Sequence, residues 1–369
     1  MAGSGTTLVI AKRQGHRAIG FDTDPMAVLL AKAWCLNVRE DGARRTAAQV
    51  LKRAVAMMKK IRSSNAYPCL KEDVETRAFV RYWFDTTNRR QLTVLSKAIQ
   101  RVKDEETRTL LWCAFSRMII TKQASVSLAM DLSHSRPHRV RDRSDVRPFG
   151  RFLSMVEAVI AAAPFKNQKG LGQIKIRPAD ARKLPLPSAS IDLVITSPPY
   201  LNAIDYLRCH KFSLIWMGYS IEEVRELRAA NIGSEVGLPA SNKNGLARVV
   251  KQMIGGQQLL PRYEGMLNRY VADMHTVIGE IARVLVPRGK ATFVIGNSTL
   301  GGVYVKNSRA VSILGMKNGL RLVSAKSRIL PNNRRYLPPP SHKNGAIYNR
   351  MRTETVVTFL KPSHEANQA

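Results

Sequence analysis

The feature that most constrains the fold is a short apolar run at residues 191–196, which leads directly into Ser197-Pro198-Pro199-Tyr200. Such a run predicts a buried strand. Because proline has no N–H to give to a ladder, the strand must end there. Ligands of open α/β sheets bind at the carboxyl ends of the strands. There the rigid loop could accept hydrogen bonds from a ligand amine through its carbonyls, and Tyr200 could stack on a base.

A second interpretation treats the Pro-Pro-Tyr run as a polyproline segment that another protein binds. Such a ligand motif has to be exposed to solvent, and a buried strand directly before it disfavours that arrangement. We therefore expect the loop to lie at the ligand-binding edge of a sheet.

Strand and helix signals alternate on both sides of this loop. Apolar runs predict strands near residues 18–22, 174–176, 291–297, 320–324 and 355–360, and apolar residues three and four apart predict a long helix over 267–285. Shorter helices are predicted at 7–13 and after Asp24-Pro25, because Asp caps helices well and Pro suits the first helical position. The alternation is typical of a Rossmann-like α/β fold, with a mostly parallel sheet covered by helices on both faces.

The middle of the chain follows a different pattern. Residues 39–151 consist of basic amphipathic segments with few strand signals, and they end in an arginine-rich loop over 133–143. We therefore expect four segments. They are the N-terminal part of the α/β domain with its glycine loop (1–38), a basic helical insert (39–151), the remainder of the α/β domain with the proline loop (152–362) and a tail (363–369).

The charge of the chain indicates its partner. The 369 residues include 59 Lys and Arg against 27 Asp and Glu, a formal net charge of +32. Such an excess attracts polyanions and releases their counterions on binding, so nucleic acid is the leading candidate. Basic chains also occur in organisms with basic proteomes and among ribosome-associated proteins, and that interpretation stays open.

Cysteine usage and hydropathy set further expectations. The four cysteines lie far apart without a Cys-x-x-Cys pair, so we expect neither a metal site nor a disulfide framework. No apolar stretch approaches the roughly 20 residues that cross a bilayer, and the N-terminus lacks a basic flank followed by an apolar block. We expect a soluble cytoplasmic protein with no membrane partner.

A glycine loop stands at the start of the chain. Ala2-Gly3-Ser4-Gly5-Thr6 directly precedes a predicted helix, whose N-terminal amides could face a ligand. Asp22 closes the next strand, about 20 residues on, where a carboxylate can bind a ribose hydroxyl of a nucleoside cofactor. A flexible chain end is the competing interpretation of the loop, and Asp24 ranks below Asp22 because it also fits a helix cap.

Two segments resemble the cofactor motif and the catalytic motif of the amino-methylating DNA methyltransferases, which use S-adenosylmethionine. They are Met1-Ala2-Gly3-Ser4-Gly5-Thr6-Thr7 and Ser197-Pro198-Pro199-Tyr200, in that order. The resemblance covers roughly the first 38 residues and residues 170–360. It implies that Asp180-Ala181 lie near the cofactor adenine. It also takes in Asp205 and Tyr206, which we expect on the nucleic-acid side of the catalytic loop.

The resemblance also implies a mechanism. The Ser197 side chain and the Pro198 carbonyl would accept the two hydrogens of an exocyclic amine, and Tyr200 would stack on the flipped base. Serine at the first position favours cytosine N4 as the acceptor, whereas Asp or Asn would favour adenine N6. Cys209 does not indicate the covalent nucleophile that methylation of a ring carbon would need.

The sequence departs from the family at two places. It begins at the glycine loop, so we expect the first strand of the fold and its Asp-Pro to be missing and the cofactor site to be incomplete. The helical insert also stands where this family does not usually carry its target-recognition region. We hypothesise that the insert contacts DNA through five arginines, with a solvated basic face as the alternative. They are Arg136, Arg139, Arg141, Arg143 and Arg147.

Three functions remain open at this level. The first is a DNA methyltransferase acting on an exocyclic amine. The second is an RNA methyltransferase acting on a base amine, because related enzymes carry a similar loop and basicity suits both polymers. The third is a truncated, non-catalytic nucleic-acid binder descended from such an enzyme. Comparison of DNA with RNA as methyl acceptor separates the first two, and cofactor binding separates the third.

Overall fold

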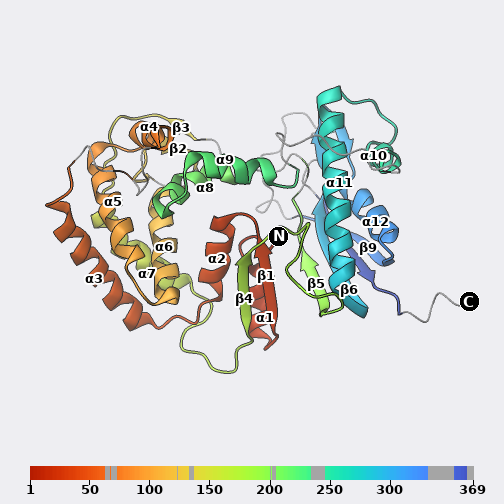
Figure 1. Ribbon diagram of the computed structural model, residues 1–369, viewed down its shortest axis with the longest axis horizontal. Helices are drawn as coiled ribbons and strands as arrows, with labels where there is room; N and C mark the ends of the chain where they lie inside the picture. The colour runs from red at the N-terminus through yellow and green to blue at the C-terminus, as the bar shows by residue number, and fades with distance from the viewer. Residues whose placement is uncertain are drawn as a thin grey trace, which may run out of the picture. The chain divides into compact units, whose positions relative to one another are not determined.

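The computed structural model describes residues 1–62, 67, 73–122, 124–132, 137–199, 201, 205–233, 246–330 and 353–363. Contacts within the chain divide it into two compact units (Figure 1). The helical unit comprises Ala2–Pro178 and Ile204–Arg228, and the sheet unit comprises Met1, Ala179–Ala203 and Ala229–Ala369. Each unit is described by itself.

The helical unit begins with a small α/β layer that matches the predicted elements. Strand β1 (Ala18–Asp22) pairs in parallel with β4 (Ile174–Pro178), and α1 (Thr6–Arg13) and α2 (Pro25–Cys35) pack beside them (Figure 1). The Asp24 side chain caps α2 by accepting a 2.9 Å hydrogen bond from the Met26 amide. The competing explanation of Asp24 as a cap is thus confirmed.

The rest of this unit is mainly helical and includes the helices predicted for the insert at 39–151. Its elements are α3 (Glu40–Met58), α4 (Val74–Trp83), α5 (Thr86–Gln100), α6 (Glu105–Ile119), α7 (Pro148–Ala162), α8 (Leu207–Leu214), η3 (Ile215–Met217) and α9 (Ile221–Ala230), with a hairpin of β2 (Ala129–Met130) and β3 (His138–Arg139). Aspartates cap α4, α5 and α6 at their N-termini. One apolar core joins α3–α7 to α8 and η3, where Phe212 packs edge-on against Trp83, and Trp216 does the same against Phe84.

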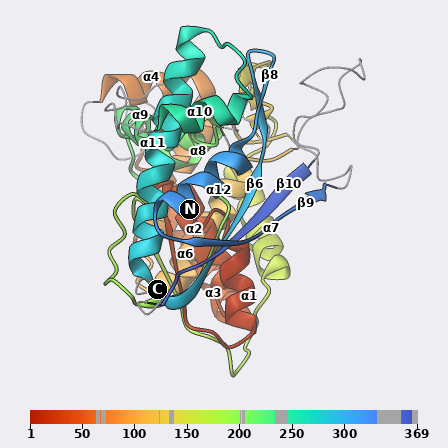
Figure 2. The ribbon, with the colours of Figure 1, turned by 90° about the vertical axis from the view of Figure 1, so that its right-hand side faces the viewer.

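The sheet unit contains four strands in the order β5-β6-β10-β9. Strand β5 (Ile191–Thr196) runs parallel to β6 (Leu285–Gly296), whereas β10 (Thr353–Leu360) runs antiparallel to both β6 and β9 (Arg321–Ile329). Helix α12 (Asn307–Lys317) contacts β6, β10 and β9, and α11 (Pro261–Val284) packs on β6 (Figure 2). Helix α10 (Ala247–Ile254) and the hairpin of β7 (Ser298–Leu300) and β8 (Val303–Val305) complete the unit.

Three details of the sheet unit differ from the sequence prediction. The final strands form, but β10 is antiparallel to both neighbours. Strand β6 begins at Leu285, six residues before the predicted start at residue 291. The backbone of Arg288 and Gly289 forms hydrogen bonds with the backbone of Lys361 and so belongs to the sheet. Strand β5 was predicted to be buried, yet Leu193 and Ile195, which lie on one face of the strand, are exposed.

The fold class predicted from the sequence is confirmed. The chain has a Rossmann-like α/β fold, with its two parallel strand pairs and covering helices, plus the helical insert. Of the helices that the structure describes, none combines the length and the hydropathy that crossing a bilayer requires.

Candidate functional site

The glycine loop is a tight turn tied to the end of β1. The Ala2 amide donates to the Phe21 carbonyl over 2.7 Å, and the Gly5 amide donates back to the Ala2 carbonyl over 3.1 Å. Gly3 and Gly5 adopt φ angles of 53° and 87°, which favour glycine. Gly3, Ser4 and Thr6 are exposed, and no side chain caps the N-terminus of α1.

Gly5 also sits against α2, which makes it the more restricted glycine. A Cβ at Gly5 would lie 2.9 Å from the Cα of Ala31, whereas one at Gly3 would meet no atom within 4 Å. We predict that Gly5→Ala lowers the free energy of unfolding by about 2–5 kcal/mol, from left-handed strain plus overpacking. Gly3→Ala adds strain alone, about 1–2 kcal/mol. Denaturant unfolding followed by circular dichroism measures the free energy of unfolding of both variants. Equal losses would show that the contact with Ala31 does not add to the destabilisation by Gly5→Ala.

Asp22 lies at the end of β1, as predicted, and holds the loop on both sides. Its Oδ2 accepts from the Gly3 amide over 2.9 Å and its Oδ1 accepts from the Asp24 amide over 3.1 Å. Asp22 therefore fixes the loop backbone with both of its oxygens.

Beside Asp22 the structure places a pair that the sequence did not reveal. The His210 Nδ1 lies 2.5 Å from the Asp24 Oδ2, and both side chains are largely buried. The ring of Tyr206, predicted on the nucleic-acid side, stacks on His210 with 5.9 Å between centroids. The segment that follows the catalytic motif is thereby fastened to the loop that carries Asp22.

Asp205 has a structural role in the same segment. Its carboxylate forms ion pairs with Arg228 and, over 3.3 Å, with Arg208. These contacts link α8 to the end of α9 within the helical unit. A role of Asp205 in binding nucleic acid stays a prediction.

The catalytic motif follows β5 in the sheet unit, where the sequence placed it. Ser197 is exposed, whereas Pro198 is buried and Pro199 is half-buried. Tyr200 lies outside the described residues. Just after the motif, the Leu201 carbonyl accepts a 2.6 Å hydrogen bond from the Ser298 hydroxyl. That hydroxyl in turn accepts a 2.8 Å hydrogen bond from the side-chain amide of Asn307.

These contacts position the motif from the neighbouring strand. Ser298 follows the carboxyl end of β6, and β6 pairs in parallel with β5, so the two strand ends lie side by side. Asn307 also donates to the Gly296 carbonyl over 3.0 Å. The sequence analysis missed Ser298 and Asn307, because their roles depend on strand pairing rather than on a local motif.

Asp180 is tightly bound by an arginine that the sequence analysis also missed. Its oxygens accept from the Arg182 guanidinium over 2.6–3.1 Å, and Arg182 reaches Asp273 on α11 over 2.9 Å. Burial acts to raise the pKa of Asp180, but the hydrogen bonds and charge of Arg182 outweigh it and leave that pKa below its usual value. Ala181 is buried in the core of this unit.

We predict that Arg182→Ala lowers the free energy of unfolding by about 2 kcal/mol near neutral pH, because charged hydrogen bonds are lost. A carboxylate with a lowered folded pKa stabilises the fold above its unfolded pKa, and this contribution disappears as the pH falls through the folded value. The difference between wild type and variant should therefore shrink below about pH 4. Urea unfolding at several pH values measures it. Exposed Arg321, at the start of β9, provides the control, and a pH-independent difference for Arg182→Ala would contradict the assignment.

Of the five arginines predicted to contact DNA, Arg136 lies outside the described residues. The other four differ in their surroundings. Arg139 pairs with Asp142 over 2.7 Å, and Arg147 pairs with Asp85 over 3.1 Å. Arg141 donates to the carbonyls of Ser125 and Ser127, both over 3.1 Å, so it holds the loop together. Arg143 is exposed.

No group of three or more His, Cys, Asp or Glu side chains in the described part of the chain is arranged to hold a metal ion. Burial raises the pKa of the Cys35 and Cys113 thiols to about 11, so both stay protonated and are poor nucleophiles.

Comparison with known proteins gives one relative by sequence. No family model matches the chain. The Type II methyltransferase M.BsoBI of Geobacillus stearothermophilus is 25% identical over 146 residues, which is 31% of this chain and 28% of the relative. The chain therefore matches less than a third of that protein's length.

Solved structures give only distant matches. One is a protein of Thermus thermophilus described as a DNA modification methylase, complexed with S-adenosyl-L-methionine. It has 18% identity and a TM-score of 0.26, and the match covers 52% of this chain and 56% of that one. Another is a SAM-dependent methyltransferase from Methanosarcina mazei, with 8% identity, a TM-score of 0.26 and coverage of 57% and 77%. Matches at this level do not bear on the fold. Over the stretch of the sequence match, the chain is similar in sequence to a Type II methyltransferase.

Proposed function

We propose that the protein transfers a methyl group from S-adenosylmethionine to the exocyclic amine of a flipped DNA base, with cytosine N4 as the preferred acceptor. The observation that carries the proposal is the Ser197-Pro198-Pro199 loop. It stands at the carboxyl end of β5, with an exposed serine on a rigid, partly buried backbone. The sequence match to a Type II methyltransferase supports methyl transfer.

The residues of the glycine loop fit the cofactor. The start of α1, which no side chain caps, suits its carboxylate, because helix N-termini favour anions. Asp22, at the end of β1, is our candidate for the ribose hydroxyls. In the sheet unit, Asp180 and Ala181 are our candidates for the adenine. When bound, S-adenosylmethionine supplies an electrophilic methyl group on a sulfonium.

The catalytic loop compensates for the weak nucleophilicity of a base amine, whose lone pair is delocalised into the ring. In our proposal the Ser197 Oγ and the Pro198 carbonyl accept the two amine hydrogens and so favour a pyramidal nitrogen. Acceptors fixed in advance act where positive charge develops, and they need no rearrangement during the reaction. Tyr200 would stack on the base and hold its plane.

The described cysteines favour an amine over a ring carbon, and Cys69 lies outside the described residues. Methylation at a ring carbon needs a thiolate nucleophile. Cys209, which follows the catalytic motif most closely, is buried, and its thiol donates to the Tyr206 carbonyl over 3.0 Å. This thiol is engaged in the helical unit rather than presented on a loop.

The test is transfer of a radiolabelled methyl group from S-adenosylmethionine to duplex DNA and, in parallel, to structured RNA. We expect label in DNA, with N4-methylcytosine as the product after digestion to nucleosides. Label in RNA alone would replace DNA with RNA as the substrate. Binding of nucleic acid without any binding of S-adenosylmethionine would identify a non-catalytic relative and refute the proposed reaction.

A further inference from the structure

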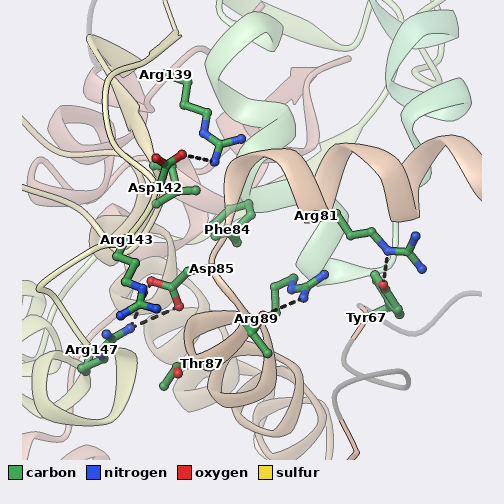
Figure 3. Close-up of a pocket in the computed structure, with 12 residues that line it drawn as sticks. Tyr67, Arg81, Phe84, Asp85, Thr87, Arg89, Arg139, Asp142, Arg143 and Arg147 are labelled. Atoms are coloured by element: carbon green, nitrogen blue, oxygen red, sulfur yellow. Dashed lines mark hydrogen bonds and ion pairs between the residues drawn. The ribbon is translucent and has the colours of Figure 1, made fainter.

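A cavity of about 650 Å³ lies in the helical unit, outside the glycine loop and the catalytic motif. The N-terminus of α5, the end of α4 and the loop after β3 form its walls (Figure 3). Five arginines line it: Arg81, Arg89, Arg139, Arg143 and Arg147. Three of them belong to the set that the sequence analysis assigned to DNA, while Arg81 and Arg89 are new.

The charges around this arginine cavity do not balance. Among the described residues, two acidic side chains line it: Asp85 pairs with Arg147, and Asp142 pairs with Arg139. Arg81, Arg89 and Arg143 form no ion pair with any described residue. Five cations against two anions leave an excess of 5 − 2 = +3 within one concavity.

The three unbalanced arginines hold donors that are not fully used. Arg81 donates to the Tyr67 hydroxyl over 2.5 Å, and Arg89 donates to the Thr86 hydroxyl over 3.1 Å. The Arg89 Nε is buried without a hydrogen-bond partner, and a buried polar atom left unpaired destabilises the protein. An anion that enters the cavity can satisfy these donors and offset the mutual repulsion of the guanidinium groups.

The shape and chemistry of the arginine cavity favour phosphate. Guanidinium groups bind phosphate oxygens through two parallel hydrogen bonds. In Figure 3, Arg81 and Arg89 approach from one side, and Arg143 and Arg147 approach from the other. Ligand sites of about 300–1,000 Å³ hold molecules of drug size. The cavity is therefore large enough for more than one phosphate group.

We propose that the arginine cavity binds consecutive phosphates of one DNA strand through Arg81, Arg89 and Arg143. The choice of DNA rests on the proposed function, and the phosphate chemistry rests on the cavity. Arg81 and Arg143 are exposed, so a strand can reach them from solvent, and Arg89 is half-buried. Arg141 is not part of the site, because it bonds to carbonyls of its own unit.

The experiment measures the salt dependence of duplex DNA binding by fluorescence anisotropy, without S-adenosylmethionine. The cavity variant carries Arg81→Gln, Arg89→Gln and Arg143→Gln. Because each phosphate contact adds about 0.9 to the slope of log K against log salt, we expect the slope to fall by about 2–3. The control variant carries Arg45→Gln, Lys52→Gln and Arg53→Gln. It removes the same three charges from an exposed face of α3, and its slope should change by less than about 1.

A second measurement uses the unaltered protein and so does not depend on folding of the variant. Phenylglyoxal modifies accessible arginines, and mass spectrometry reads each position. We expect DNA to protect Arg81 and Arg143 at least tenfold and to leave Arg45 and Arg53 reactive. Equal slopes for both variants without protection would overturn the proposal.

The remaining outcomes are equally decisive. Protection by pyrophosphate or a deoxynucleoside monophosphate, but not by DNA, would make the cavity a small-anion site and overturn the proposal. Protection by structured RNA alone would do the same. Neither measurement involves methyl transfer, so protection by DNA supports the arginine cavity even if the proposed reaction fails.

Discussion

Replacing Ser197 with alanine should lower kcat for methyl transfer to DNA by about 100-fold or more. The variant lacks the side-chain oxygen that accepts an amine hydrogen, and removal of one such preorganised partner typically lowers kcat by about 10²–10³. The Kd for S-adenosylmethionine should stay unchanged, because Ser197 belongs to the catalytic loop after β5 and not to the glycine loop. Single-turnover transfer of a labelled methyl group measures the rate.

Ser190→Ala provides the matched control for this variant. Ser190 is an exposed serine in the turn before β5, and its hydroxyl donates to the Pro187 carbonyl over 2.7 Å. Its replacement should leave kcat unchanged. If Ser197→Ala retains kcat within about threefold of wild type, the side chain of Ser197 does not act on the amine.

Replacing Asp22 with alanine should raise the Kd for S-adenosylmethionine by about 10- to 100-fold. Hydrogen bonds to a charged group contribute about 1.5–3 kcal/mol, and each 1.4 kcal/mol is a factor of ten. Two effects combine in this variant. The ribose hydroxyls lose their acceptor, and the amides of Gly3 and Asp24 lose the carboxylate that orders the loop. Isothermal titration calorimetry measures the affinity.

Two comparison variants separate these effects. Asp22→Asn retains one carboxamide oxygen as an acceptor, and its loss of affinity should be intermediate. Asp145→Ala removes an exposed carboxylate from the same unit and should leave the affinity unchanged. An unaltered Kd in Asp22→Ala would remove Asp22 from the cofactor site.

The sequence predicted well those features that depend on neighbouring residues. The Asp24 cap, the glycine turn and the strand before the proline loop all follow from local backbone chemistry. The helical character of the insert follows from its apolar spacing, which is also a local property. Local chemistry therefore sufficed to predict these parts of the fold and of the candidate site.

Features that depend on distant residues could not be predicted in this way. An apolar run predicts a strand but not its direction, so the antiparallel pairing of β10 was missed. The partner of Arg182 on α11 lies 91 residues away in the chain. Arg81 and Arg89 belong to helices that gave no reason to single them out, and only the fold brings them to the same cavity as Arg143.

The identity of the methylated nucleoside tests the central claim most directly. Host DNA from cells with and without this protein is digested to nucleosides and separated by liquid chromatography with mass spectrometry. The account predicts that N4-methylcytosine appears only when the protein is present and disappears with Ser197→Ala. Protein-dependent 5-methylcytosine, or methylation confined to RNA, would contradict it.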